Sequence, residues 1–116
     1  MRELTTAGEV FRLIYRDMKP KLINCAELDI LLFIYDRTWS FGKPAEVIPY
    51  RHFTDGIHLS GTGRYIASPL MCGRSTLIKS LQRLERAGMI ARRRIMSGEY
   101  AYTINTSWRP RKRIKI

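Results

Sequence analysis

The sequence predicts an α+β fold that is mainly helical and carries one β-hairpin near its C-terminus. Apolar residues recur at helical spacing in the first half, an amphipathic helix lies between two glycines, and two later segments alternate apolar and polar residues. With 116 residues, 45% of them hydrophobic, the chain has the size of one globular domain. We divide it into an N-terminal helical extension at 1–22, a main domain at 23–106 and a basic tail at 107–116.

Two helices are predicted in the first half of the chain. Thr6 and Glu9 have the spacing of a capping box, and Pro20 ends the helix that they begin. Asn24 is the expected cap of the second helix. Apolar residues on nearly every side of 28–35 predict that this second helix is central, and it should end between Trp39 and Gly42.

The middle of the chain predicts short elements. Residues 46–49 form at most a short extended piece, and 51–57 favours one short helix. The segment 58–70 is rich in Gly and Ser, so we expect a loop or insertion there.

The clearest pattern belongs to a helix at 75–87. Leu77, Leu81 and Leu84 form its expected buried stripe, and Gly88 is a good C-terminal stop. The alternating segments 89–95 and 100–105 follow, with Ser-Gly at 97–98 as the hairpin turn between them.

Positive charge is concentrated at one end of the chain. The formal net charge is +11, from 21 Lys and Arg against 10 Asp and Glu. Residues 1–73 hold nine basic and eight acidic residues, whereas 74–116 hold twelve and two. A C-terminal third with a net charge of +10 is the electrostatic pattern expected of a nucleic-acid binder.

The element order is helix, helix, short helix, long helix and hairpin, which is the layout of a winged helix-turn-helix domain. The stretch 73–90 resembles the recognition helix and wing entry of that family, with its Arg-Ser-Thr start, Leu-Glu pair, Gly and Met-Ile pair. The upstream half is similar to the N-terminal DNA-binding domain of phage replication protein O, through Thr38-Trp39, Gly42-Lys43, Val47-Ile48 and 50–57. The resemblance covers about residues 24–104 and implies a DNA-binding domain at 23–106.

Two departures from that family bear on function. The segment 58–70 is longer than the tight turn of a simple helix-turn-helix. The 116 residues also hold nothing that matches the helicase-recruiting region of protein O, which favours regulation over replication.

The recognition helix supplies the expected base readers. A helix in the major groove reads base edges mainly with its N-terminal side chains, and an Arg can pair with guanine in a bidentate manner. We expect base contacts from Arg74, Ser75, Thr76, Lys79, Ser80 and Arg83.

The hairpin, the short helix and the tail supply the expected backbone or minor-groove contacts. Alternation sends Arg92 and Arg94 to one face of the hairpin and Arg93 to the other. The tail could instead dock on a second copy through Trp108 and Ile114. The residues expected to contact the backbone or minor groove are Arg51, His52, Arg92, Arg93, Arg94, Arg109, Arg111, Lys112, Arg113 and Lys115.

Other classes of site are not favoured. Cys25, Cys72, His52 and His58 lack the spacing of a zinc finger, and we expect Cys25 to be buried. No phosphate loop, His-Glu-x-x-His motif or supportable catalytic set is present, so we expect no enzyme activity, cofactor, metal or small-molecule ligand. No window of about 18 apolar residues indicates a membrane span, and no secretory signal opens the chain.

We therefore expect a sequence-specific protein that binds double-stranded DNA in the cytoplasm, associated with the nucleoid. The favoured role is transcriptional regulation in a phage, plasmid or integrative element. Two alternatives stay open, an origin-binding replication initiation protein and a winged-helix module that binds another protein. A monomer and a homodimer both stay open, because the first helix or the tail could pair two copies.

Overall fold

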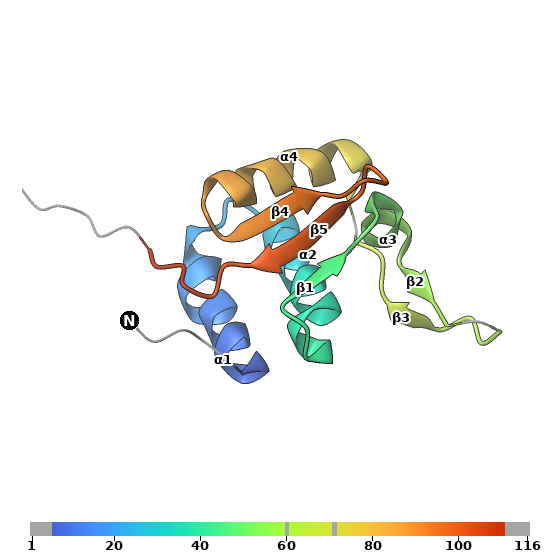
Figure 1. Cartoon of the computed structure of the whole chain (residues 1–116), viewed down its shortest axis with the longest axis horizontal. Helices are drawn as coiled ribbons and strands as arrows, with labels where there is room; N and C mark the ends of the chain where they lie inside the picture. Colours follow the sequence, from blue (N-terminus) through green and yellow to red (C-terminus); the bar gives the residue numbers. More distant parts are fainter. Residues whose placement is uncertain (1–5, 60, 71, 111–116) are drawn as a thin grey trace, which may run out of the picture.

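The computed structural model describes residues 6–59, 61–70 and 72–110. In this part of the chain, four α-helices pack with a three-stranded antiparallel sheet, and a separate two-stranded hairpin projects from one side (Figure 1). The fold is therefore α+β, as the sequence predicts.

The first helical segment begins at the predicted cap. The Thr6 hydroxyl oxygen accepts the backbone N–H of Glu9 at 3.1 Å and so starts α1 (Ala7–Arg12). The helix continues through a π-helical stretch, η1 (Leu13–Met18), and a 3-10 turn, η2 (Lys19–Lys21). Its inner face joins the same hydrophobic core as the rest of the fold through Val10, Leu13, Ile14 and Met18. The segment expected to be an extension is thus packed into the core.

The second helix is central, as its apolar pattern predicts. Asn24 caps α2 (Cys25–Arg37) by accepting the Glu27 N–H at 3.1 Å. The helix ends before a 3-10 turn, η3 (Trp39–Phe41), and Gly42 then has a φ of +71°. Cys25 is the first residue of α2, directly after the Asn24 cap, and its side chain is exposed. The expectation that Cys25 is buried is therefore wrong.

A three-stranded sheet joins the middle of the chain to its end. Its strands are β1 (Ala45–Val47), β4 (Ile90–Arg94) and β5 (Tyr100–Ile104), and they lie in the order β1-β5-β4. The β4–β5 hairpin confirms the predicted one, and Gly98 in its turn has a φ of +91°.

Two helices lie between β1 and β4. The short α3 (Tyr50–Asp55) and the long α4 (Arg74–Arg86) both match their predictions within one or two residues. The segment 58–70 is expected to be a loop, but it contributes to a hairpin of β2 (Ile57–His58) and β3 (Tyr65–Ala67). The hairpin forms because Ile57 pairs with Ala67, which is buried in the core, while the glycines at 61 and 63 take left-handed backbone angles at the tip.

The folded part of the chain extends further than predicted. The sequence pattern places Trp108 in the basic tail, yet this residue is only 9% exposed. Its indole N–H donates to the Ala87 carbonyl oxygen at 2.9 Å, which fixes the chain against the end of α4. The core residue at this corner is therefore a tryptophan that no local periodicity could reveal.

The helices of the described part also bear on the membrane question. None of them combines the length and the apolar content that crossing a bilayer requires.

Candidate nucleic-acid interface

The outer face of α4 carries polar and basic side chains along its whole length. Leu77, Leu81 and Leu84 are buried, so the opposite face points to solvent. Exposed side chains at positions i, i+4, i+7 and i+11 form one stripe. This outer stripe consists of Ser75, Lys79, Gln82 and Arg86.

The start of α4 presents the predicted base readers. Arg74, Ser75 and Thr76 are all exposed in its first turn. Gln82 and Arg86 are absent from the predicted site residues, although their spacing from Lys79 places them on the same face. The helical period alone could have found them.

Ser80 is a correction to the prediction. It is only 6% exposed and lies on the buried side of α4 with Leu77 and Leu84. A hydroxyl in that position cannot reach a base edge, so we remove it from the candidate interface.

Arg83 is also corrected, because its charge is already paired. Its guanidinium binds the carboxylate of Glu27, with Nη2 at 2.7 Å from Oε1, and Nη2 also donates to the Lys21 carbonyl oxygen at 3.2 Å. Burial raises the pKa of Glu27, but the hydrogen bonds from Arg83 and the Ile23 N–H outweigh it and leave this pKa below its usual value. Arg83 therefore ties α4 to α2 instead of projecting toward a ligand.

A stack of rings and guanidinium groups joins α3, α4 and the β4–β5 hairpin. The Tyr50 and Tyr100 rings lie 6.3 Å apart and nearly parallel. The Arg74 Cζ lies 5.3 Å from the Tyr50 centroid, and the Arg92 Cζ lies 4.6 Å from that of Tyr100. The stack holds the first residue of α4 beside the hairpin.

Arg92 is expected to contact phosphate, and the structure gives it a different role. Its side chain is only 8% exposed. It donates from Nη1 to the Tyr50 hydroxyl and from Nε to Glu85, both at 3.3 Å. Burial lowers the pKa of Arg92, but these two hydrogen bonds outweigh it and raise the pKa overall. Arg92 fixes the hairpin against α3 and α4.

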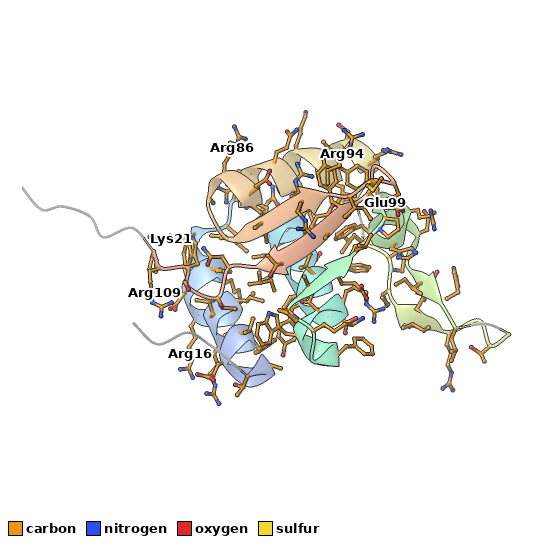
Figure 2. All side chains as sticks on the ribbon, viewed as in Figure 1. Arg16, Lys21, Arg86, Arg94, Glu99 and Arg109 are labelled. Atoms are coloured by element: carbon orange, nitrogen blue, oxygen red, sulfur yellow. The ribbon has the colours of Figure 1, made fainter. Side chains whose placement is uncertain are left out.

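The other two arginines of β4 remain accessible. Arg93 and Arg94 are both exposed. Figure 2 shows Arg94 and Arg86 pointing out from the same upper side of the molecule, near α4 and the hairpin, with Glu99 close to the hairpin turn. Arg94 thus shares a side with the outer stripe of α4, whereas strand alternation turns Arg93 to the other face of the hairpin.

A cavity of about 450 Å³ lies where α3, α4 and the hairpin turn meet. Arg51 and Arg74 supply positive charge to its lining, and Glu99 supplies one carboxylate. His52 is half-buried, and burial and the neighbouring Arg51 lower its pKa, so its imidazole is neutral at pH 7. His52 therefore offers no charge to a phosphate at that pH, whereas the exposed Arg51 does.

The predicted tail residues are only partly described. Arg109 is exposed at the far end of α4, where its Nη1 donates to the Trp108 carbonyl oxygen at 2.7 Å. Arg111, Lys112, Arg113 and Lys115 lie outside the described residues.

Within residues 6–59, 61–70 and 72–110, no group of three or more His, Cys, Asp or Glu side chains could hold a metal ion. Cys25 and Cys72 are both free, and burial raises the pKa of the Cys72 thiol.

No family model, curated protein or solved structure matches this chain.

Proposed function

We propose that this chain is a sequence-specific double-stranded DNA-binding protein with a winged helix-turn-helix architecture. In this proposal α2, α3 and α4 are the three helices, α4 is the recognition helix and the β4–β5 hairpin is the wing. The strand order β1-β5-β4 and the placement of α3 and α4 between β1 and β4 support the assignment. The β2–β3 hairpin is an addition between the two helices of the helix-turn-helix.

One observation carries the proposal: among the described residues of the basic third, α4 and the adjoining strand β4 carry exposed cations that have no ion pair. Arg74, Lys79 and Arg86 are exposed on the helix, and Arg93 and Arg94 are exposed on the adjoining strand. The cations that are paired, Arg83 and Arg92, hold this surface in shape. Exposed arginine and lysine on one helix and its neighbouring hairpin match the phosphate and base contacts of a duplex.

The biological role that we favour is transcriptional regulation in a phage, plasmid or integrative element, in the cytoplasm with the nucleoid. This rests on the resemblance of 24–104 to the protein O family and on the charge distribution. Binding alone would produce the effect, by occupying DNA. The replication alternative differs in where the chain binds, at an origin rather than a promoter.

Arg74→Ala tests the base-reading role. We expect this variant to weaken binding to a selected site by about fivefold or more while changing binding to random duplex little, because a bidentate Arg contributes about 1–3 kcal/mol of discrimination. A site is first selected from random duplexes, and affinities are then measured by fluorescence anisotropy. Arg64→Ala, on the exposed β2–β3 hairpin, is the matched control. Equal losses on both duplexes would contradict base reading by Arg74.

The same measurement distinguishes the proposed function from a protein-binding module. For a protein-binding module, the selection would yield no preferred duplex, and the wild-type chain would bind every duplex weakly and with the same affinity. That outcome would overturn the proposed function.

A further inference from the structure

A second concave surface lies at the other end of α4, away from the base readers. Its volume is about 650 Å³, larger than that of the cavity at the start of the helix. Its lining comes from η2, from the end of α4 and from the segment after β5. We call this surface the rear pocket.

All the charged side chains that line the rear pocket are positive. The ionisable residues in its lining are Lys21, Arg83, Arg86 and Arg109, with no carboxylate among them. Arg83 is compensated by Glu27, which lies behind it. Lys21, Arg86 and Arg109 are exposed and have no ion pair among the described residues. Three cations therefore line the rear pocket, and no carboxylate is among its lining residues; Figure 2 shows Lys21 and Arg109 near each other, whereas Arg86 points out from the upper side of α4.

The floor of the rear pocket is held rigidly. The Trp108 indole is fixed to the Ala87 carbonyl oxygen at 2.9 Å, and the Asn105 amide donates to the Gly88 carbonyl oxygen at 2.8 Å. The Arg83 Nη2 also donates to the Lys21 carbonyl oxygen, which ties the η2 side of the pocket to α4. Figure 2 shows Lys21 and Arg109 close to each other at the end of the molecule opposite Glu99.

We propose that the rear pocket binds the phosphodiester backbone of the same duplex that α4 reads. Three exposed cations around a concave surface with a fixed floor can pair with the oxygens of phosphate groups. The 13 residues of α4 span about 20 Å, enough to cross a major groove about 12 Å wide from one backbone to the other. The pocket then holds one backbone while the start of α4 contacts bases. This inference rests on the proposed function.

The test compares salt dependence for the wild-type chain and for the triple variant Lys21→Gln, Arg86→Gln, Arg109→Gln. Removing one contact with a phosphate should reduce the slope of log affinity against log salt by about 0.9, so the slope of the triple variant should be smaller by about 2 to 3. Affinity should fall equally on selected and random duplexes, because backbone contacts carry no sequence information. Arg64→Gln removes an exposed arginine elsewhere and should leave the slope unchanged.

Inorganic phosphate provides a second probe. We expect it to shift the indole N–H resonance of Trp108 in the wild-type chain, but not in the triple variant, with Trp39 as the internal reference. A shift that persists in the triple variant would overturn the site.

The possible results separate the two proposals. If the triple variant keeps the wild-type slope while Arg74→Ala still weakens specific binding, the rear pocket is overturned and the proposed function stands. If the wild-type chain binds no duplex, the proposed function fails. A phosphate shift at Trp108 in that case would indicate a site for free phosphate and would overturn the duplex as its occupant.

Discussion

At the scale of single residues, the carboxylate of Glu27 organises the junction between the first and second helical segments and α4. It is 1% exposed and accepts hydrogen bonds from the Ile23 N–H and from Arg83. A buried carboxylate is tolerated only when its oxygens are paired in this way. The pair uses an arginine that the sequence pattern assigns to the DNA surface.

We predict that Glu27→Gln destabilises the fold by about 2–3 kcal/mol at pH 7, because Arg83 loses its counter-charge while remaining partly solvated. The lowered pKa of Glu27 means that its ionised form stabilises the folded state above about pH 4.5. This contribution disappears as the pH falls through the lowered pKa, so the difference between wild type and variant should shrink in acid. Chemical denaturation at several pH values measures it, with the exposed Asp29→Asn as control. Equal stability of Glu27→Gln and wild type at pH 7 would contradict the prediction.

At this scale, the sequence could not show which arginines pair with a carboxylate and which stay exposed to solvent. Arg83 and Arg86 are three residues apart on one helix and look alike in the pattern. Their difference comes from Glu27, 56 residues away from Arg83 in the chain. Arg92 likewise looks the same as its two arginine neighbours until Tyr50 and Glu85 are placed beside it.

At the scale of elements, local signals located most of the structure. These signals are all short-range. The caps at Thr6 and Asn24 begin α1 and α2, the leucine stripe marks the buried face of α4, and the Ser-Gly turn joins β4 to β5, each as predicted. The β2–β3 hairpin escapes prediction because its strands have only two and three residues, too few to show an alternating pattern.

The entry to the β2–β3 hairpin depends on one glycine. Gly56 has a φ of +75°, and a Cβ there would lie 2.7 Å from the Ala67 carbonyl oxygen and 2.9 Å from Pro69. We predict that Gly56→Ala destabilises the fold by about 2 kcal/mol or more, through backbone strain and this clash. Thermal unfolding of the purified variant measures the loss.

Gly8→Ala is the matched control for Gly56→Ala. Gly8 lies in α1, and a Cβ at this position would have no other atom within 4 Å. An alanine there should therefore stabilise the helix by about 0.5–1 kcal/mol. If both variants changed stability by the same amount, neither the strain nor the close approach at Gly56 would explain the result.

At the scale of the whole molecule, the charge distribution and the fold point to the same surface. The excess positive charge lies in residues 74–116, and the described residues of this stretch form α4, the β4–β5 hairpin and the segment that follows β5 up to residue 110. The sequence could predict that concentration of charge, but not that it divides between the two ends of α4. That division depends on Lys21 and Trp108, which the fold brings to the end of the helix from outside it.

The most direct test is to map duplex DNA onto the folded chain. The isotopically labelled protein is titrated with a duplex of about two helical turns at low salt, and the backbone amide resonances are followed. We predict shifts in the first turn of α4, in the β4–β5 turn and around Gly88, with the outer face of α1 and the tip of the β2–β3 hairpin unchanged. An absence of shifts, or shifts confined to α1 or the β2–β3 hairpin, would contradict duplex binding through α4.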